Sequence, residues 1–186
     1  MQQRIQLATG NGEIVSGVIC TMIQRHLLQI ETLWENMLIE AEQADMDWNW
    51  DYKLRLATNN DRFEAYVIEQ DDLVNGVVLI ETQWHRSQVS YGEALSLDDR
   101  NPLVYVEYLA SAPWNRRSLE DPPFFEGVGT ALLSFARQRS VELGYGGRVG
   151  LHSLPNSEAF YHRCNMPNYG PDPDKDELVY FEYGTI

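Results

Sequence analysis

The 186 residues predict one domain of the α/β class, spanning residues 1–186, in which helices alternate with the strands of a mixed sheet. Residues 21–44 and 131–143 carry apolar side chains at helical spacing, and strand-like runs lie before and after both. Two of these runs, 62–70 and 77–84, are joined by so few residues that they should pair antiparallel. The apolar content of 44% is that of a globular chain with a hydrophobic core.

The N-terminal half is predicted to hold most of the antiparallel strands and the longest helix. Residues 4–19 surround the turn signal Asn11-Gly12 and predict a short strand or a hairpin. After the helix over 21–44 comes an acidic, aromatic segment, 45–51, which could recognise a cation or, more often, is a loop pinned to the core by its tryptophans. The strands 62–70 and 77–84 follow, with turn chemistry at Asp71-Asp72 and at Asn75-Gly76.

The C-terminal half is predicted to begin with a loop over 85–101, which leads to a strand over 104–110. The helix over 131–143 is stopped by the glycines of 144–147, and a short strand occupies 148–152. A further helix is predicted over 155–162, with Asn156 or Ser157 as its N-cap. A Pro- and Asp-rich loop, 168–175, then leads to a last strand over 178–183.

The stretch 124–130 (FFEGVGT) is the most informative part of the chain, because it lies between a strand and a helix. Gly127 and Gly129 let backbone approach a ligand closely, and the first turn of a helix offers N–H groups to an anion. Leu132 occupies the place of the third glycine of the dinucleotide fingerprint, so that pattern fails. The turn alone fits either an ordinary loop-to-helix junction or a pyrophosphate site.

Three segments in order give the C-terminal half a family resemblance: 106–113 (VEYLASAP), 127–133 (GVGTALL) and 156–166 (NSEAFYHRCNM). Together they resemble the core of the GNAT superfamily, the Gcn5-related N-acetyltransferases. The resemblance implies a mixed, mostly antiparallel central sheet that is flanked by helices and splayed at an acyl-CoA cleft. It also implies acetyl-CoA as the acyl-donor substrate, with no metal.

The chain departs from the family pattern in two places. Phe124 stands where the family's cofactor motif has Gln or Arg. Pro113 lies fourteen positions before Gly127, so a loop of about eight residues is inserted there. Arg116 and Arg117 of this loop are expected to supply positive charge for the anionic coenzyme.

The resemblance also implies roles for individual residues. The backbone of Leu109, Ala110 and Ser111 would pair with pantetheine and steady the developing oxyanion. The turn Gly127, Val128, Gly129 and Thr130 would hold the pyrophosphate. Asn156 would hydrogen-bond pantetheine, or serve as a helix cap, or both.

Two further residues carry the expected proton transfers. Tyr161 falls at the family's tyrosine position and would protonate the leaving thiolate, the alternative being a packing aromatic. Asn165 replaces the usual glycine there, and asparagine tolerates a left-handed backbone. Glu107 is either the base for the acceptor ammonium or a solvent-facing strand acid.

The predicted function is transfer of an acetyl group from acetyl-CoA to a primary amine, on a small molecule or a protein, by direct attack in a ternary complex. The rival is a catalytically silent acyl-CoA-binding or regulatory module, which Phe124 and the inserted loop motivate. The net charge of −14 argues against nucleic acid, whose phosphates would be repelled. No apolar run or signal peptide indicates a membrane, so a cytoplasmic location is expected. The aromatic C-terminal strand could pair in a homodimer, and His152, His162 and Cys164 fit no closed zinc site.

Overall fold

The computed structural model describes residues 2–88 and 100–186. The chain divides into two compact units, which are described in turn: unit 1 comprises Met1–Leu79 and Tyr108–Leu133, and unit 2 comprises Ile80–Glu107 and Ser134–Ile186. Of the predicted loop over 85–101, residues 89–99 lie outside the described part. Among the described residues, no helix is long and apolar enough to cross a bilayer.

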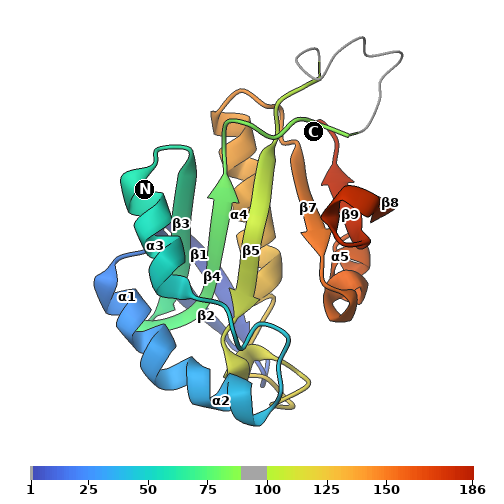
Figure 1. The fold of residues 1–186 in the computed structure, drawn as a ribbon. Coiled ribbons are helices and arrows are strands. Elements are labelled where there is room, and N and C mark those ends of the chain that lie inside the picture. Colours follow the sequence, from blue (N-terminus) through green and yellow to red (C-terminus); the bar gives the residue numbers. More distant parts are fainter. Residues whose placement is uncertain (1, 89–99) are drawn as a thin grey trace. The chain divides into compact units, whose positions relative to one another are not determined.

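The strands of unit 1 follow the hydrogen-bonded order β6-β1-β2-β3-β4-β5, of which β1 to β5 are labelled in Figure 1. β1 (Gln2–Thr9) and β2 (Ile14–Thr21) pair antiparallel from Gln2↔Cys20 to Ala8↔Ile14, which confirms the predicted hairpin. β2 pairs antiparallel with β3 (Phe63–Gln70), and the short β6 (Phe125–Glu126) pairs antiparallel with β1.

β4 (Leu73–Glu81) begins four residues earlier than predicted. Asp71 and Asp72 alone join it to β3, and both have positive φ angles, 48° and 61°, as a two-residue hairpin turn requires. The predicted turn at Asn75-Gly76 is wrong, because both residues lie inside β4. Both residues contribute to packing instead. Asn75 is fully buried and hydrogen-bonded by its side chain, and Gly76 leaves room for the helix that begins at Val128.

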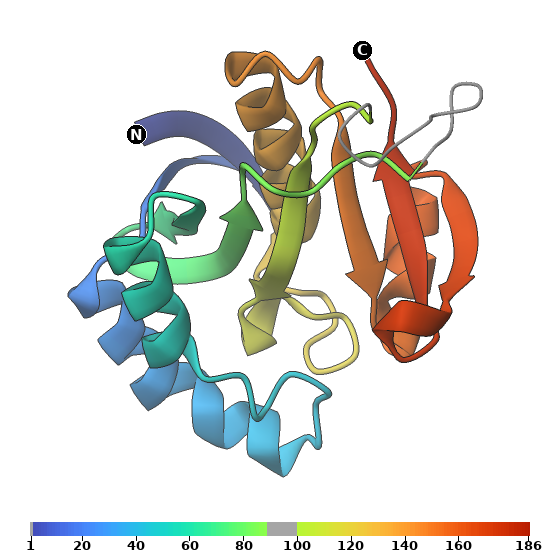
Figure 2. The ribbon, with the colours of Figure 1, turned by 45° about the horizontal axis from the view of Figure 1, so that its top comes forward.

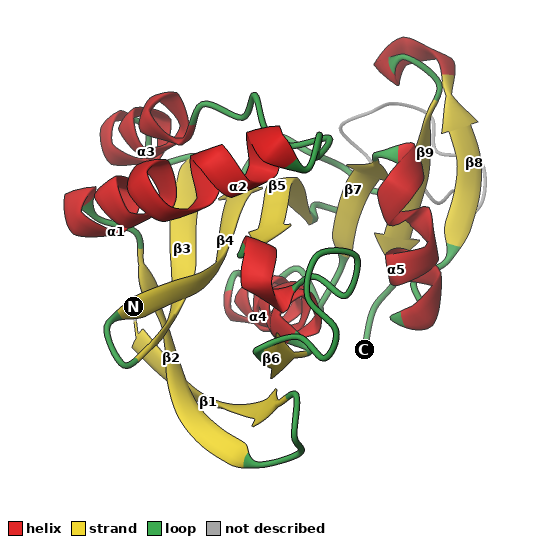
Figure 3. Cartoon of the chain, turned by 90° about the horizontal axis from the view of Figure 1, so that it is seen from below, coloured by secondary structure: helices red, strands yellow, loops and turns green. Residues whose placement is uncertain are grey.

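The long predicted helix is present as α1 (Gln24–Gln29), a π-helical turn (Ile30–Trp34) and α2 (Glu35–Glu40). α3 (Trp50–Asn59) was missed, because it buries only Trp50, Lys53 and Leu54 and so shows little apolar periodicity. Asn49 caps it by accepting a hydrogen bond from the Tyr52 N–H at 2.8 Å. Figure 3 shows α1, α2 and α3 on one face of β3 and β4, with the start of α4 on the other.

The core beneath these helices is aliphatic in the strands, whereas the helices contribute both aliphatic side chains and tryptophans. Val67, Val74 and Val77 are fully buried on the strands. Trp34 is fully buried on the π-helical turn, and its ring meets that of Trp114 edge-on at 6.2 Å. This edge-on pair anchors the segment after β5 to the helical layer.

The strands of unit 2 follow the order β5-β7-β9-β8. β5 (Val104–Ser111) and β7 (Val149–Ser153) are parallel, whereas β9 (Leu178–Tyr183) pairs antiparallel with β7 and with β8 (Asn168–Asp172). The described ladder between β5 and β7 covers only Val104↔Val149 and Tyr105↔Gly150. Most described pairings in the sheet are therefore antiparallel, and the parallel pair meets over two residues only.

The predicted loop over 168–175 is wrong for its first five residues, which form β8. Pro171 and Gly170 suggested a loop, but β8 is the last strand in the hydrogen-bonded order, where a missing backbone N–H is tolerated. The ladder with β9 is irregular between Asn168 and Pro171, and Gly170 has a φ of 90°. Figure 2 shows β8 and β9 side by side, joined by a short 3₁₀ turn (Pro173–Lys175).

Two helices complete unit 2. α4 (Val128–Glu142) enters from unit 1, and α5 (Glu158–Arg163) follows a 3₁₀ turn (Pro155–Ser157). Ser157 occupies the N-cap position of α5, but no side chain makes a cap hydrogen bond there. The predicted capping role is therefore wrong for Asn156 as well as Ser157, because the 3₁₀ turn runs directly into the helix.

Candidate functional site: a glycine turn in unit 1 and a buried tyrosine in unit 2

The glycine turn opens directly onto α4. Gly127 has a φ of 75°, a left-handed backbone that favours glycine, and a Cβ added there would meet nothing within 4 Å. The helix begins at Val128, three residues earlier than predicted, so Gly129 and Thr130 lie in its first turn. The first-turn N–H groups of a helix have no intrahelical partner and lie at the positive end of its dipole. This turn can therefore receive an anion.

Gly76 of β4 sets how closely α4 approaches the strands. A Cβ at Gly76 would lie 2.6 Å from Val128 Cγ1, 3.1 Å from Leu132 Cδ1 and 3.5 Å from the Ala110 carbonyl oxygen. Val128 and Ala110, two of the predicted cofactor-binding residues, therefore both flank this glycine. The structure brings the end of β5 and the glycine turn together within unit 1.

The inserted loop is an ordered connection in unit 1, held by two asparagines. Asn75 Oδ1 accepts hydrogen bonds from Trp114 Nε1 at 2.9 Å and from Asn115 Nδ2 at 3.1 Å. Asn115 Oδ1 in turn accepts from the Phe125 N–H at 2.8 Å. The buried amide of Asn75 thus fixes the strand that leads into the glycine turn, while Phe124 remains 63% exposed.

The end of β5 carries the backbone that is predicted to face pantetheine. Ala110 is buried, and Leu109 and Ser111 are half-buried. The Ser111 carbonyl oxygen accepts a hydrogen bond from Arg116 Nε at 2.9 Å. The loop therefore also holds the last residue of β5 in place.

The two arginines of the loop are already paired with carboxylates. Arg116 forms a bidentate ion pair with Asp45, at 2.7 and 2.6 Å. Arg117 pairs with Glu126 and lies 3.8 Å from Asp121. In a chain with 28 acidic and 14 basic residues, acidic partners thus lie near both arginines, and their role toward a coenzyme stays a prediction.

The acidic, aromatic segment 45–51 is pinned to the core and encloses a cation of the protein itself. Lys53 Nζ lies 3.8 Å from the ring centroid of Tyr108, 5.4 Å from that of Trp50 and 5.8 Å from that of Trp48. Burial lowers the pKa of Lys53 to about 8. The ring faces that could have recognised a ligand cation are thus occupied by this lysine.

A small cavity of about 150 Å³ lies beside this cluster in unit 1. Indole rings and carboxylates share its lining, which includes Trp34, Trp48, Trp50, Glu31, Glu35 and Asp45. Its Asp45 is neutralised by Arg116. The cavity remains acidic through the two exposed glutamates of the helical layer.

Tyr161, the predicted acid, lies on α5 of unit 2. Its side chain is 7% exposed, and its ring packs 5.5 Å from that of Phe181. Burial raises the pKa of its phenol, which therefore stays protonated at neutral pH. Within residues 2–88 and 100–186 its hydroxyl makes no hydrogen bond. Asn165 has a φ of 55°, which confirms the predicted left-handed backbone.

The remaining predicted residues of unit 2 lie on different elements. Asn156 is exposed on its 3₁₀ turn, and Glu107 is half-buried on β5. Glu107 has a neighbour that the sequence did not reveal: its Oε1 lies 3.7 Å from His85 Nε2. No sequence pattern links the two, because they are 22 positions apart in a segment predicted as loop and strand.

A second cluster missed by the sequence joins Cys20, His26 and Glu69 of unit 1, whose ligand-type atoms lie within 4.8 Å of one another. The Ile23 N–H donates to His26 Nδ1 at 3.1 Å, so the proton of the neutral ring is on Nε2, which faces Glu69 Oε1 at 3.4 Å. Arg25 binds both oxygens of Glu69, and burial raises the pKa of the Cys20 thiol to about 11. This donor set fits a hydrogen-bonded cluster better than a metal centre.

Comparisons with known proteins bear on the fold. No protein-family model matches the chain, and no curated protein matches it. Among solved structures, a GNAT-family acetyltransferase from Listeria monocytogenes is similar at a TM-score of 0.55 and 14% identity, over 96% of this chain and 99% of that one. An acetyltransferase from Streptococcus agalactiae is similar at a TM-score of 0.57 and 12% identity, over 89% of this chain and 96% of that one.

A third similar structure is a Bacillus subtilis acetyltransferase solved in complex with CoA. It matches at a TM-score of 0.53 and 16% identity, over 90% of this chain and 98% of that one. At these identities the likeness establishes the fold alone. The helix-flanked, mostly antiparallel mixed sheet of this chain is the fold of the GNAT-family acetyltransferases.

Proposed function

We propose that the chain is an N-acetyltransferase that moves an acetyl group from acetyl-CoA to a primary amine by direct attack in a ternary complex. The observation that carries the proposal is the glycine turn at the start of the 15-residue helix α4, flanked through Gly76 by the end of β5. A helix N-terminus with a left-handed glycine suits a pyrophosphate, and the backbone of a strand end suits an amide-bearing arm. The shared fold with a CoA-bound acetyltransferase supports the same assignment.

In this proposal Gly127, Val128, Gly129 and Thr130 hold the pyrophosphate through their backbone. Leu109, Ala110 and Ser111 pair with pantetheine and steady the oxyanion, and Asn156, which has no cap to make, hydrogen-bonds the same arm. The pyrophosphate and oxyanion assignments rely on main-chain groups, which do not require a polar side chain at position 124.

Tyr161 is the proposed acid. Its buried phenol remains protonated, and a protonated phenol can donate to the departing thiolate. The acceptor is an amine on a small molecule or a protein, to which the acidic surface of the chain is attractive. No metal takes part in the proposed reaction.

The experiment combines a thiol-release assay over a panel of primary amines with a thermal shift against acetyl-CoA. We expect acetyl-CoA to raise Tm and at least one amine to release CoA, with the acetylated amine identified by mass spectrometry. A Tm shift without CoA release for any amine would favour the catalytically silent acyl-CoA-binding module. The absence of both would overturn transferase and module together.

The variant Tyr161→Phe tests the acid. We expect turnover to fall about 100-fold while the Tm shift with acetyl-CoA is kept, because only the proton donor is lost. Tyr169→Phe, at an exposed tyrosine of β8, is the matched control and should keep wild-type turnover. Equal rates for Tyr161→Phe and wild type would remove the assigned role.

A further inference from the structure

His85 lies in unit 2 directly after β4, between two carboxylates. Its Nε2 is 3.7 Å from Glu107 Oε1 and 3.9 Å from Glu81 Oε2. Glu81 is fully buried and accepts hydrogen bonds from the backbone N–H groups of Gln83, Trp84 and His85, at 2.7, 2.8 and 3.1 Å. The buried carboxylate therefore fixes the backbone that carries the imidazole.

The ring of His85 is positioned from its other side by an aromatic partner. It stacks on Tyr105 with centroids 3.9 Å apart and an interplanar angle of 11°. The Tyr105 hydroxyl is 2.6 Å from His152 Nδ1, and His152 Nε2 is 2.9 Å from Asp172 Oδ2. Burial lowers the pKa of His152, so its neutral ring donates to Asp172 and accepts from Tyr105. Tyr105 is thus held rigidly as a platform for the His85 ring.

The two members of the pair remain accessible to a ligand. The side chain of His85 is 29% exposed and that of Glu107 is 28% exposed, in contrast to Glu81 beneath them. Leu109 follows Glu107 by two residues on β5, and a strand rises about 3.3 Å per residue. Along the chain, Glu107 therefore directly precedes the β5 backbone that is proposed for the acyl arm.

We propose that His85, oriented by Tyr105 and flanked by Glu107 and Glu81, is the base that removes the proton of the acceptor ammonium. This inference rests on the proposed acetyltransferase function. It replaces Glu107 as the direct base and makes that carboxylate the partner that stabilises the imidazolium once it forms. The two carboxylates also attract the incoming ammonium to the ring.

The proton transfers balance. The neutral ring accepts one proton from R–NH₃⁺ at its unprotonated nitrogen and leaves a neutral amine. The amine nitrogen attacks the thioester carbonyl, so a C–N bond forms and the C–S bond breaks. Tyr161 protonates the departing thiolate, and the second proton that the nitrogen loses passes through solvent to the Tyr161 phenolate. His85 returns its own proton to solvent, so one proton is released per turnover.

The test is the pH profile of kcat/KM for the amine at saturating acetyl-CoA, for wild type, His85→Gln and Glu107→Gln. We expect kcat/KM of His85→Gln to be about 100-fold lower than that of wild type at pH 7. The loss in kcat/KM should shrink to about 10-fold or less near pH 9.5, because a much larger share of the amine then arrives neutral and needs no base. Glu107→Gln should show a smaller decrease in kcat/KM, and this decrease should vary with pH in the same way. Imidazole added to His85→Ala should restore part of the rate.

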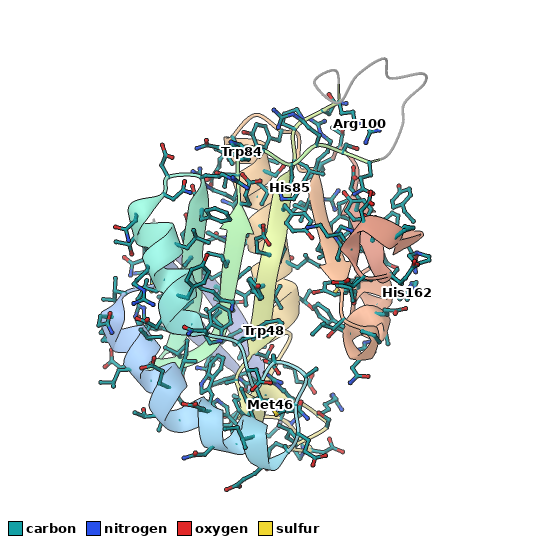
Figure 4. All side chains as sticks on the ribbon, in the orientation of Figure 1. Met46, Trp48, Trp84, His85, Arg100 and His162 are labelled. Atoms are coloured by element: carbon teal, nitrogen blue, oxygen red, sulfur yellow. The ribbon has the colours of Figure 1, made fainter. Side chains whose placement is uncertain are left out.

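Controls separate a chemical role from a structural one. His162→Gln, at an exposed histidine of α5, should keep the wild-type profile (Figure 4). Each variant should keep the Tm shift with acetyl-CoA. A loss that is the same at every pH and is not rescued by imidazole would overturn the role of His85, as would an unchanged rate. Wild-type protein that turns over no amine would instead overturn the proposed function itself, so the two failures are distinct.

Discussion

Lys53 is a buried cation whose removal should stabilise the protein. Its side chain is 5% exposed among Trp48, Trp50 and Tyr108, and its hydrogen bond to the Asn49 carbonyl oxygen is long, at 3.5 Å. Burial lowers its pKa from 10.5 to about 8. At about 1.4 kcal/mol per pKa unit, keeping the ammonium charged in the folded protein costs on the order of 3 kcal/mol.

Part of that cost is recovered by the ring faces and by residual solvation. An ammonium over an aromatic face gains about 1–2 kcal/mol, most of it here from the Tyr108 ring at 3.8 Å. Replacing the lysine by methionine keeps the length and removes the charge. We therefore expect Lys53→Met to raise the free energy of unfolding by about 1–2 kcal/mol at pH 7.

The stability gained by Lys53→Met should decrease as the pH rises. Between about pH 8 and 10.5 the unfolded chain binds a proton at Lys53 that the folded protein does not, so the wild-type free energy of unfolding rises with pH in this window. The advantage of Lys53→Met is therefore greatest below pH 8 and disappears above about pH 10.5. Other titrating groups cancel in the difference between the two proteins.

The assay is urea unfolding of both proteins from pH 7 to pH 10.5, together with the lysine NMR signals. The sequence contains only Lys53 and Lys175, so exposed Lys175 serves as the internal reference. Lys175→Met should leave the free energy of unfolding unchanged. A Lys53 signal that titrates near 10.5, or a Lys53→Met variant less stable than wild type at pH 7, would refute the reasoning.

Three further substitutions test other parts of the structure. Gly76→Val places a Cβ 2.6 Å from Val128 Cγ1, so we expect the free energy of unfolding, measured in urea, to fall by about 1–3 kcal/mol. Acetyl-CoA should also bind more weakly. Wild-type values for both stability and binding would contradict the packing. Arg116→Met leaves the Asp45 carboxylate unpaired and should lower the free energy of unfolding by about 3 kcal/mol. The double variant with Asp45→Asn should recover much of that stability. Glu182→Gln replaces a fully buried acceptor by a group that also donates, and should lower Tm by several degrees without changing acetyl-CoA affinity.

Elements with strong local patterns were predictable from the sequence. The hairpin around Asn11-Gly12, the long helix of the N-terminal half and the last strand all formed within a few residues of their predicted bounds. Helix α4 began three residues early, because glycines are tolerated in a first turn where tertiary packing holds it. The left-handed backbone of Asn165 also followed from residue type alone.

The errors in the predicted secondary structure share one physical cause: a residue can be present because it packs against or hydrogen-bonds to a residue far away in the sequence. Asn75 and Gly76 carry turn chemistry, yet one anchors the inserted loop and the other admits a helix. Pro171 suggested a loop, but an edge strand does not need its N–H. α3 escaped notice because much of its buried face consists of a lysine and a tryptophan.

The sequence by itself determined the class of fold and the glycine turn, since both follow from patterns of neighbouring residues. Its resemblance to the GNAT superfamily supplied the residues proposed for the acyl donor. Only the tertiary structure decided which charges are available. It paired Arg116 with Asp45, enclosed Lys53 among its own aromatic rings and brought His85 to Glu107. Electrostatic interactions act through space over a few ångströms, and sequence separation does not report that distance.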